Sequence, residues 1–415
     1  MSDTAQVRIR LKTREESYAV PDVPLIVPLS LKRYGLSQVV NKVLSLDRSV
    51  PFDFFVGSNK TLLKTSLDKY LIENGLSPEN ELEIEYARSI IPPVHSGSFP
   101  HDDWVSSVAP SEEIIVTGSF DGYIRVWDYS GNATATLSAH EDGVKAVSWA
   151  EGGALVSGGM DGLIKLWDVP KSRCVSQFMG HTAPINSIIA KGNLLVSAGA
   201  DGQLGIWNLD AKPTVIKPKK KKAKLEDNYV EPQSIVSHSV RQGNVSSPLT
   251  DIIFSPKDST VAYSVSENHT IQTWDLLTPQ VVETSTTSFP LSALTALPQV
   301  GILAVGSTAR HILLHDPRAQ TISSGQLNGH TGIVSSLAPS PESEFMLVSA
   351  SYDSTLRIWD IRVPGSSLYT IQRANGTRSD RVFDVDWIKT GIFSVGTDKN
   401  LQINASTGAR ATEEN

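Results

Sequence analysis

The sequence repeats with a period of about forty residues, and this repeat restricts the possible folds more than any other feature. Each copy has a turn residue, usually Asp, six residues before a Trp or its substitute, as in Asp121 and Trp127. The pair returns six times: Asp161 and Trp167, Asp201 and Trp207, Asn268 and Trp274, Ala309 and His315, Asp353 and Trp359, and Asp398 and Asn404. Seven copies at this period predict a seven-bladed β-propeller in which each repeat supplies one four-stranded blade.

A histidine precedes the turn aspartate by 20 to 23 residues in four copies, at His101, His140, His181 and His330. Such a histidine can hydrogen-bond the aspartate, and the contacts can continue through a Ser or Thr to the Trp indole, because buried polar groups need partners. A metal site or an acid–base pair would use the same residue types. We favour the structural interpretation because the pairs recur once per blade and do not converge on one site.

A propeller must close its ring, and the last repeat leaves its blade incomplete. After Asn404 the sequence contains no apolar strand. We therefore expect residues 89–94 to supply the outer strand of the last blade and to cover an edge that could otherwise aggregate. The predicted organisation is a small domain at 1–88, a junction with the closing strand at 89–100, and the propeller at 101–415.

One repeat is too long. Trp207 and Trp274 are 67 residues apart, which exceeds one period by about 27 residues and predicts a surface insertion at a blade junction, at about 212–236. The insertion carries a run of lysines that cannot pack and that we expect to be disordered: Lys219, Lys220, Lys221, Lys222 and Lys224. The run is either a solvated loop or a nuclear import signal or RNA-phosphate contact. We favour the functional interpretation because five of the six residues from Lys219 onward are lysine.

Residues 1–88 contain no repeat and predict a separate small α+β domain. Residues 7–11 alternate as a half-buried strand, 18–27 form a second extended segment, and 31–46 place apolar residues on one helical face. Residues 52–56 form a third strand, 66–74 a short helix before Gly75, and 81–86 a last strand. This order predicts a ubiquitin-like roll. Because it runs directly into the propeller without a free Gly-Gly tail, it is better interpreted as a docking module than as a conjugated modifier.

An acidic stretch ends this domain, and one of its carboxylates differs from the others. A solvated strand face accounts for Glu81, Glu83 and Glu85, whereas Glu79 lies in a turn that a proline shapes. A loop-held carboxylate that points outward can supply an oxygen ligand to a divalent ion held by a partner, because Mg²⁺ prefers hard oxygen donors. On the residues alone, a solvated turn and a metal contact both stay open.

Composition excludes several classes of function. One cysteine, Cys174, excludes a disulfide scaffold and a multi-cysteine zinc site. No stretch is apolar enough for a membrane span, and the first residues do not resemble a secretion signal, so we expect no membrane partner. The net charge of −7 argues against a surface built throughout for nucleic acid.

The residue just before each turn aspartate should face the rim of one propeller opening. Phe120, Met160 and Tyr352 hold this position in three copies. Exposed Phe, Met and Tyr side chains on one face are favoured anchors of protein interfaces. Packing against neighbouring loops is the alternative that we weight equally.

The combination of a ubiquitin-like domain and seven WD-type repeats resembles the Notchless-like arrangement of ribosome assembly factors. The stretches Ser-Leu-Lys-Arg-Tyr-Gly-Leu-Ser at 30–37, Val-Pro-Phe-Asp-Phe at 50–54, Glu-Tyr-Ala-Arg at 85–88 and Asp-Trp-Val-Ser-Ser at 103–107 are closer still to the WD-repeat subunits of the pescadillo–Bop (PeBoW) complex. The resemblance covers essentially the whole chain. It implies a mainly β protein, with a seven-bladed WD-repeat β-propeller preceded by a small α+β ubiquitin-like domain.

The resemblance also implies a scaffold of the nucleolus and nucleoplasm that has no catalytic residue and no cofactor of its own, and that serves maturation of the large ribosomal subunit. In this family the propeller binds the Bop-type WD-repeat subunit, which holds pescadillo. The metal-dependent adhesion site of the AAA ATPase midasin grips the ubiquitin-like domain through Mg²⁺, and ATP-driven pulling removes the factor from the pre-60S particle.

The family's metal-contacting glutamate lies in a Gly-Leu-Ser-x-Glu turn, which here ends at Glu79. The resemblance therefore makes Glu79 the predicted ligand in trans, with Glu81 as the fallback. The lysine run suits nuclear entry and leaves an rRNA contact open. His315 and Asn404 depart from the Trp of the repeat, and we expect them to weaken the polar contacts of two blades without changing the blade count.

Two other functions remain as alternatives. A substrate-receptor adaptor in ubiquitin signalling would also combine these two domains, and affinity purification would then recover ubiquitin ligase subunits. A propeller hydrolase needs a nucleophile or convergent carboxylates at the central opening. No G-x-S-x-G, H-E-x-x-H or P-loop string occurs in the sequence.

Overall fold

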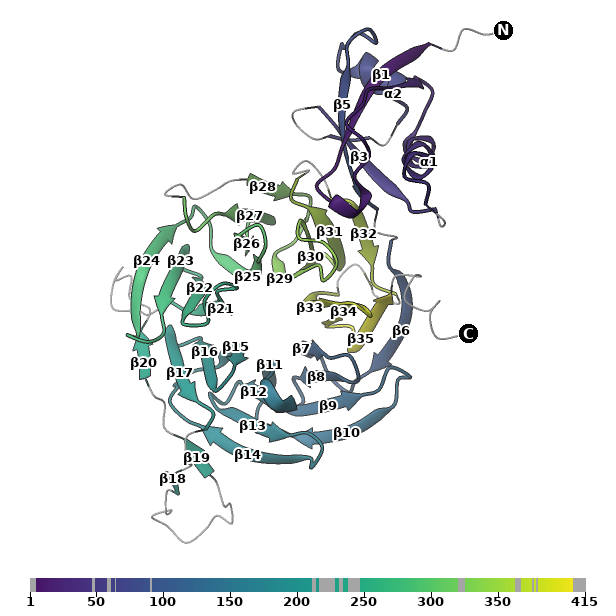
Figure 1. The fold of residues 1–415 in the computed structure, drawn as a ribbon. Coiled ribbons are helices and arrows are strands. Elements are labelled where there is room, and N and C mark those ends of the chain that lie inside the picture. The colour runs from purple at the N-terminus through teal and green to yellow at the C-terminus, as the bar shows by residue number, and fades with distance from the viewer. Residues whose placement is uncertain are drawn as a thin grey trace. The chain divides into compact units, whose positions relative to one another are not determined.

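The computed structural model describes residues 5–46, 49–57, 61–63, 65–89, 92–210, 214–215, 228–230, 234–237, 247–319, 325–362, 367–374, 377 and 380–405. The chain divides into two compact units, Met1–Pro92 and Pro93–Asn415 (Figure 1). Among the described residues, no helix has both the length and the apolar character needed to cross a bilayer.

The first unit is a five-stranded sheet with two helices. Its elements are β1 (Gln6–Lys12), a 3-10 turn (Glu16–Tyr18), β2 (Leu25–Pro28), α1 (Arg33–Leu44), β3 (Phe52–Val56), β4 (Thr61–Leu62), α2 (Leu67–Glu73) and β5 (Leu82–Arg88). The strand order is β2-β1-β5-β3-β4, with β1 and β5 parallel. This is the predicted ubiquitin-like roll, although the short strand β4 was not expected from the sequence.

The core of this unit forms between one face of the sheet and helix α1. Alternation in β1 buries Val7, Ile9 and Leu11, and α1 contributes Leu36 and Val40. The helix is shorter than the predicted 31–46 because Ser45 adopts a left-handed conformation with φ of 51°, which ends it. The buried apolar face of the helix therefore ends before its last turn, where Val43 is 39% exposed.

The second unit contains seven four-stranded blades arranged in a ring (Figure 1). Blade 1 contains β7 (Val105–Pro110), β8 (Ile115–Ser119), β9 (Tyr123–Trp127) and β10 (Ala133–Ser138). Blade 2 contains β11 (Val144–Trp149), a 3-10 turn (Glu151–Gly153), β12 (Leu155–Gly159), β13 (Ile164–Asp168) and β14 (Arg173–Phe178). Blade 3 contains β15 (Ile185–Lys191), β16 (Leu194–Gly199), β17 (Gln203–Asn208) and β20 (Ser234–Ser237).

The remaining blades have the same organisation. Blade 4 contains β21 (Leu249–Phe254), β22 (Val261–Ser266), β23 (Thr270–Asp275) and β24 (Gln280–Thr286). Blade 5 contains β25 (Leu291–Leu297), β26 (Ile302–Ser307), β27 (His311–His315) and β28 (Gly325–Asn328). Blade 6 contains β29 (Val334–Pro339), β30 (Met346–Ser351), β31 (Thr355–Asp360) and β32 (Tyr369–Gln372). Blade 7 contains β33 (Val382–Ile388), β34 (Gly391–Gly396), β35 (Asn400–Ala405) and β6 (Val94–Pro100).

The Asp-Gly pair of the repeat has a local physical cause. It forms the tight turn between the second and third strands of a blade, where the aspartate side chain accepts a hydrogen bond from the backbone two residues later, as Asp161 does from Leu163 at 3.0 Å. The residue after the Asp position has a positive φ in every blade, +76° at Gly162 and +58° at Lys399. Glycine reaches this conformation without strain, which explains its place in the first three repeats.

The ring closes through an N-terminal strand inside the predicted junction 89–100, but this strand begins five residues later than the predicted segment 89–94. The strand that pairs antiparallel with β35 is β6, which begins at Val94, where the predicted segment 89–94 ends. Phe99 lies opposite Leu401 and packs in the same cluster as Ile403 and Trp127. The prediction failed on position because residues 94–100 look polar, and this strand buries mainly Phe99.

The long insertion was also placed wrongly. It does not lie at a blade junction: it separates the third strand of blade 3, β17, from the fourth, β20. Between them, β18 (Thr214–Val215) and β19 (Asn228–Val230) pair with each other, and β19 runs parallel to β14 of blade 2. Repeat spacing locates extra residues but does not show which strand pair they separate.

Candidate functional sites

The turn that carries Glu79 is shaped by its own backbone. Ser66 caps the start of helix α2, because its side chain accepts a hydrogen bond from Lys69 N, and after the end of the helix Gly75 takes a φ of +63°. Ser77 then accepts a hydrogen bond from Glu79 N through its side chain and one from Asn80 N through its carbonyl, each at 3.3 Å. Glu79 is exposed, and no described residue forms a hydrogen bond or an ion pair with its carboxylate.

The three glutamates that follow are already paired with cations on β1 or just after its end. Arg10 donates to Glu81, Lys12 lies 2.8 Å from Glu83, and Arg14 lies 3.2 Å from Glu85. The hydrogen bond from Lys12 lowers the pKa of Glu83. These pairs form a charged ladder across β1 and β5 that ends at Glu81. Glu79 lies in the turn before β5 and outside this ladder, so its carboxylate is available to a partner. Glu81 would first have to break its ion pair with Arg10.

The repeated His and Asp residues of the propeller form structural networks. In blade 2, His140 Nδ1 lies 3.0 Å from both oxygens of Asp161, and Nε2 lies 2.9 Å from Ser157 Oγ, which accepts from Trp167 Nε1. Burial acts against ionisation of Asp161, but the hydrogen bond and charge of His140 hold its pKa below the usual value. Equivalent networks join His181, Asp201, Ser197 and Trp207, and His330, Asp353, Ser349 and Trp359. The structural interpretation is confirmed for these three blades.

Blade 1 departs from the prediction. His101 does not contact Asp121: its Nδ1 lies 3.1 Å from the carbonyl of Phe99 and its Nε2 lies 2.8 Å from Thr117. Asp121 forms an ion pair with Arg125 instead, at 2.7 Å. Burial, assisted by the charge of Arg125, lowers the pKa of His101 to about 4, so this histidine is neutral. The arginine on β9 thus replaces the histidine as the partner of the turn aspartate.

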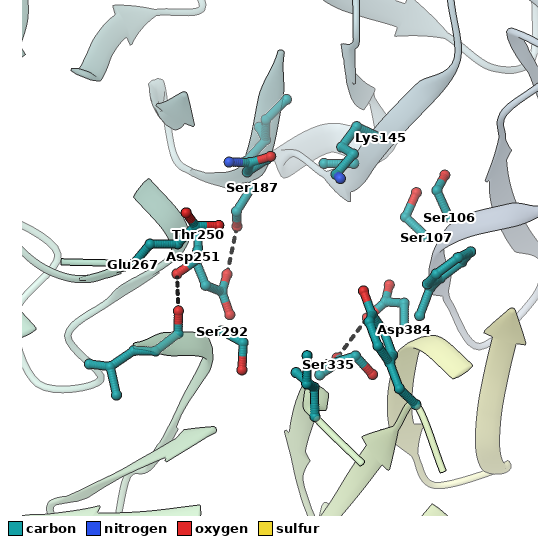
Figure 2. A pocket seen from close by; sticks show the side chains of 18 of the residues that line it. Ser106, Ser107, Lys145, Ser187, Thr250, Asp251, Glu267, Ser292, Ser335 and Asp384 are labelled. Atoms are coloured by element: carbon teal, nitrogen blue, oxygen red, sulfur yellow. Dashed lines mark hydrogen bonds between the residues drawn. The ribbon is translucent and has the colours of Figure 1, made fainter. Parts of the chain in front are cut away.

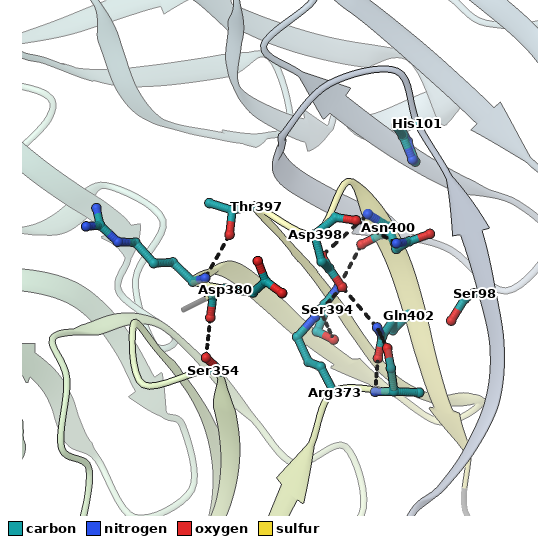
Figure 3. A network of polar contacts seen from close by, with 12 residues as sticks. Ser98, His101, Ser354, Arg373, Asp380, Ser394, Thr397, Asp398, Asn400 and Gln402 are labelled. Carbon is teal, nitrogen blue, oxygen red and sulfur yellow. Dashed lines mark hydrogen bonds and ion pairs between the residues drawn. The ribbon is translucent and has the colours of Figure 1, made fainter. Parts of the chain in front are cut away.

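Blade 7 uses an arginine that the sequence analysis missed. Arg373 donates to both oxygens of Asp398 and to Ser394 Oγ, at 2.6 to 3.0 Å (Figure 3). It occupies the role that histidine has in blades 2, 3 and 6, in the blade whose Trp is replaced by Asn404. The spacing in the sequence could have identified this arginine, because Arg373 precedes Asp398 by 25 residues and His330 precedes Asp353 by a similar 23 residues.

Two aspartates connect neighbouring blades along the channel wall, and both were missed. Asp251 of blade 4 accepts from Ser187 of blade 3 at 2.7 Å (Figure 2) and from Leu294 N of blade 5 at 2.8 Å. Asp384 of blade 7 accepts from Ser336 of blade 6 and from Val108 N of blade 1. Each carboxylate is the third residue of a mainly apolar inner strand, which is the signal that could have found it.

The predicted rim residues lie around one mouth of the propeller channel. A cavity of about 640 Å³ is lined by Phe120 and Tyr352 together with Lys145, Glu267 and Phe383. Met160 does not line this cavity. It lies next to it, because its sulfur is near Gly143 beside Phe120, and its side chain is 38% exposed. Both interpretations of these side chains therefore have support: they pack on one another, and part of their surface remains open.

The aromatic side chains at this mouth form one cluster. Phe120 packs on Trp104 and Phe383, with ring centroids 6.0 and 5.9 Å apart, and Tyr352 packs on Phe383 at 6.0 Å. Trp104 is 46% exposed. Trp104 and Phe383 were not singled out from the sequence, because neither holds the position before a turn aspartate.

The run Lys219–222 and Lys224 lies outside the described residues. Among the described residues, no group of three or more His, Cys, Asp and Glu side chains could hold a metal ion. Aromatic side chains such as those at the channel mouth are common at protein interfaces, and a carboxylate such as that of Glu79 is an oxygen donor of the kind that a divalent ion binds.

Comparison with known proteins agrees with both units. The profile of the "NLE (NUC135) domain" matches residues 7–71, and that of the "WD domain, G-beta repeat" matches residues 93–128, 131–168, 172–208 and 321–360. "Ribosome biogenesis protein ytm1" of Schizosaccharomyces pombe is 39% identical over 99% of this chain and 98% of its own length. The corresponding proteins of Eremothecium gossypii and Aspergillus fumigatus are 41% and 39% identical over 97% of this chain and over 98% and 96% of their own lengths.

The fold and these matches define a WD-repeat propeller protein with an N-terminal NLE domain. Identity near 39% over the whole length also fixes the family. The chain belongs to the family of ribosome biogenesis protein YTM1, in agreement with the resemblance to ribosome assembly factors carried by the sequence stretches at 30–37, 50–54, 85–88 and 103–107.

Proposed function

We propose that this protein is a non-catalytic scaffold in the biogenesis of the large (60S) ribosomal subunit and in pre-rRNA maturation. Its propeller binds the Bop-type WD-repeat subunit, and through it pescadillo. Its NLE domain docks on the metal-dependent adhesion site of midasin, so that ATP hydrolysis pulls the protein from the pre-60S particle. The names of the relatives support the setting in ribosome biogenesis, and a location in the nucleolus and nucleoplasm follows from that setting.

The observation that carries the docking proposal is the state of Glu79. It is an exposed carboxylate in a hydrogen-bonded turn, with no described side chain to neutralise it. Mg²⁺ keeps near-octahedral oxygen coordination, so a site that lacks one protein ligand accepts a carboxylate from another molecule. The Mg²⁺ belongs to midasin in this proposal, and Glu79 supplies one oxygen. The exposed apolar side chains of Ile72 and Leu76 lie in the preceding segment and extend the contact surface.

Replacement of Glu79 tests this proposal directly. Glu79→Ala and Glu79→Gln remove the charged ligand from an exposed turn, so the NLE domain should stay folded while its affinity for the midasin adhesion domain in Mg²⁺ falls by about 100-fold or more, as at an interface hot spot. Glu73→Ala, which removes another exposed carboxylate at the end of α2, is the matched control and should bind like the parent. Isothermal titration calorimetry measures both affinities.

Removal of the metal provides an independent check. EDTA should abolish binding of the parent chain, because the contact passes through the ion, and Glu79→Asp should retain only part of the affinity because its side chain is shorter. Unchanged binding of Glu79→Ala, or binding that survives EDTA, would show that Glu79 is not a metal ligand.

A further inference from the structure

The innermost strands of the propeller carry a ring of contacts between blades, and this ring has two gaps. In five blades the second residue of the inner strand donates a hydrogen bond to the carbonyl of the first inner-strand residue of the next blade. These bonds are 2.5 to 3.1 Å long and come from Ser106, Asn186, Thr250, Ser292 and Ser335. The same position holds Lys145 in blade 2 and Phe383 in blade 7.

The two gaps lie on the same arc of the channel mouth. Blades 2 and 7 are the neighbours of blade 1, which contributes Trp104 and Phe120 to the aromatic cluster. Phe383, at one gap, packs directly in that cluster. Lys145, at the other, lines the same cavity as Phe120 (Figure 2). It lies two residues after Gly143, where an added Cβ would meet Phe120 and Met160. Where the ring lacks its usual polar contacts, the mouth therefore presents the Lys145 cation beside several aromatic side chains, one of which, Tyr352, also carries Arg381 stacked on its ring.

The Lys145 ammonium is not satisfied within the protein. No described residue accepts a hydrogen bond from it or forms an ion pair with it. Burial in the cavity wall lowers the pKa of Lys145, and the charge of Glu267 offsets this only in part. The side chain is half-buried and lines the cavity, so its ammonium faces the cavity without a hydrogen-bond acceptor among the described residues. A carboxylate from another molecule would supply the missing acceptor, and the aromatic cluster would cover the apolar groups beside it.

The charges around the mouth favour a single carboxylate over a polyanion. Glu141 and Asp142 are exposed on the loop that leads into β11, and Asp102 and Asp103 lie on the loop that leads into β7. A nucleic acid would bring many phosphates close to these acidic side chains, whereas one Asp or Glu within an apolar segment brings a single negative charge, which can lie beside Lys145 although Glu267 lines the same cavity.

From this geometry we infer that the channel mouth is a docking site for an acidic residue of a protein partner, flanked by apolar residues that cover Trp104 and Phe120. The carboxylate pairs with Lys145. This inference rests on the proposed function, because the partner that would carry the segment is the Bop-type subunit that the propeller binds.

Charge removal and charge reversal at Lys145 test the inference. Affinities of full-length variants for the purified Bop-type subunit are measured by calorimetry. Lys145→Met keeps the length of the side chain and should weaken binding by about 30-fold, and Lys145→Glu should weaken it further, because one partner of a buried ion pair is lost or reversed. Lys191→Glu, at the other end of the next inner strand, should leave the affinity unchanged. Thermal unfolding confirms folding, and Lys145→Met should be at least as stable as the parent.

The outcomes separate the inference from the proposed function. If the parent chain does not bind the Bop-type subunit, the proposed function is wrong and the inference falls with it. If the parent binds and Lys145→Glu binds equally well, the inference alone is wrong. A single-stranded RNA that binds the parent and not Lys145→Glu, while binding of the Bop-type subunit is unaffected, would instead assign the mouth to nucleic acid. Restored binding between Lys145→Glu and a partner variant with one acidic residue changed to Lys would support the pairing directly.

Discussion

At the residue scale, single polar side chains connect the blades. Asp251 accepts hydrogen bonds from Ser187, Ile252 N and Leu294 N, so one carboxylate links three consecutive blades. Burial raises its pKa to about 6 although these hydrogen bonds act to lower it. The carboxylate thus gives directional contacts between blades, but its ionisation is less favourable in the folded propeller than in the unfolded chain.

This shift predicts how stability changes with pH. The folded pKa lies above the unfolded value, so the folded protein binds more protons between about pH 4 and 7, and the contribution of Asp251 to the free energy of unfolding falls as pH rises through that window. Asp251→Asn is neutral at every pH. Relative to the parent, its free energy of unfolding should therefore rise by about 1 kcal/mol between about pH 4.5 and 7.5, after allowance for partial exposure to the channel.

The measurement is selective for the propeller. All eight tryptophans, from Trp104 to Trp387, lie in the second unit, so denaturant unfolding followed by tryptophan fluorescence reports on that unit alone. Asp142→Asn removes an exposed aspartate and provides the control, whose difference from the parent should not change across the window. A pH-independent difference for Asp251→Asn would show that this carboxylate is not responsible.

At the element scale, the sequence predicted the parts that repeat and missed those that occur once. The turn of each blade was predictable because its Asp residue satisfies a local backbone requirement, as at Asp161. The closing strand was misplaced by several residues, because its position depends on pairing with β35, about 300 residues away. Arg373 was missed for a similar reason, since arginine can replace histidine wherever a buried aspartate needs a donor.

The insertion between β17 and β20 allows a prediction for the lysine run. Deletion of residues 217–224 should reduce nuclear accumulation, because it removes the five lysines at 219–222 and 224, which would be read as an import signal, together with Lys217. The blade strands lie outside the deletion and the shortened connection still spans from Asn208 to Ser234, so binding to the Bop-type subunit should be retained. Fluorescence microscopy and a pull-down measure the two results. Fusion of an unrelated import signal should restore accumulation, and full accumulation without the run would contradict its role.

At the scale of the whole molecule, the two proposed binding sites lie in different units. Glu79 belongs to Met1–Pro92, whereas the closing strand and the channel mouth belong to Pro93–Asn415. The sequence predicted this division, since the small domain contains no repeat and the repeats begin after its end. The surface chemistry was harder to predict: whether Glu79 or Glu81 is available depends on Arg10, which is far away in sequence and adjacent only through the parallel pairing of β1 and β5.

This division predicts that binding can be separated from release. A fragment of residues 93–415 retains β6 and should fold and bind the Bop-type subunit, whereas 101–415 lacks β6 and should aggregate, because the edge of β35 and the apolar surface under Phe99 become exposed. A fragment of residues 1–92 should still bind midasin through Glu79.

On pre-60S particles, however, 93–415 should remain bound in the presence of midasin and ATP even when 1–92 is added in trans, because a pulling force acts on the propeller only through a covalent connection. Sedimentation of the particles after ATP addition measures release, with the full chain as the positive control. Release of 93–415 as complete as that of the full chain would mean that the propeller is detached by a route that does not pass through Glu79.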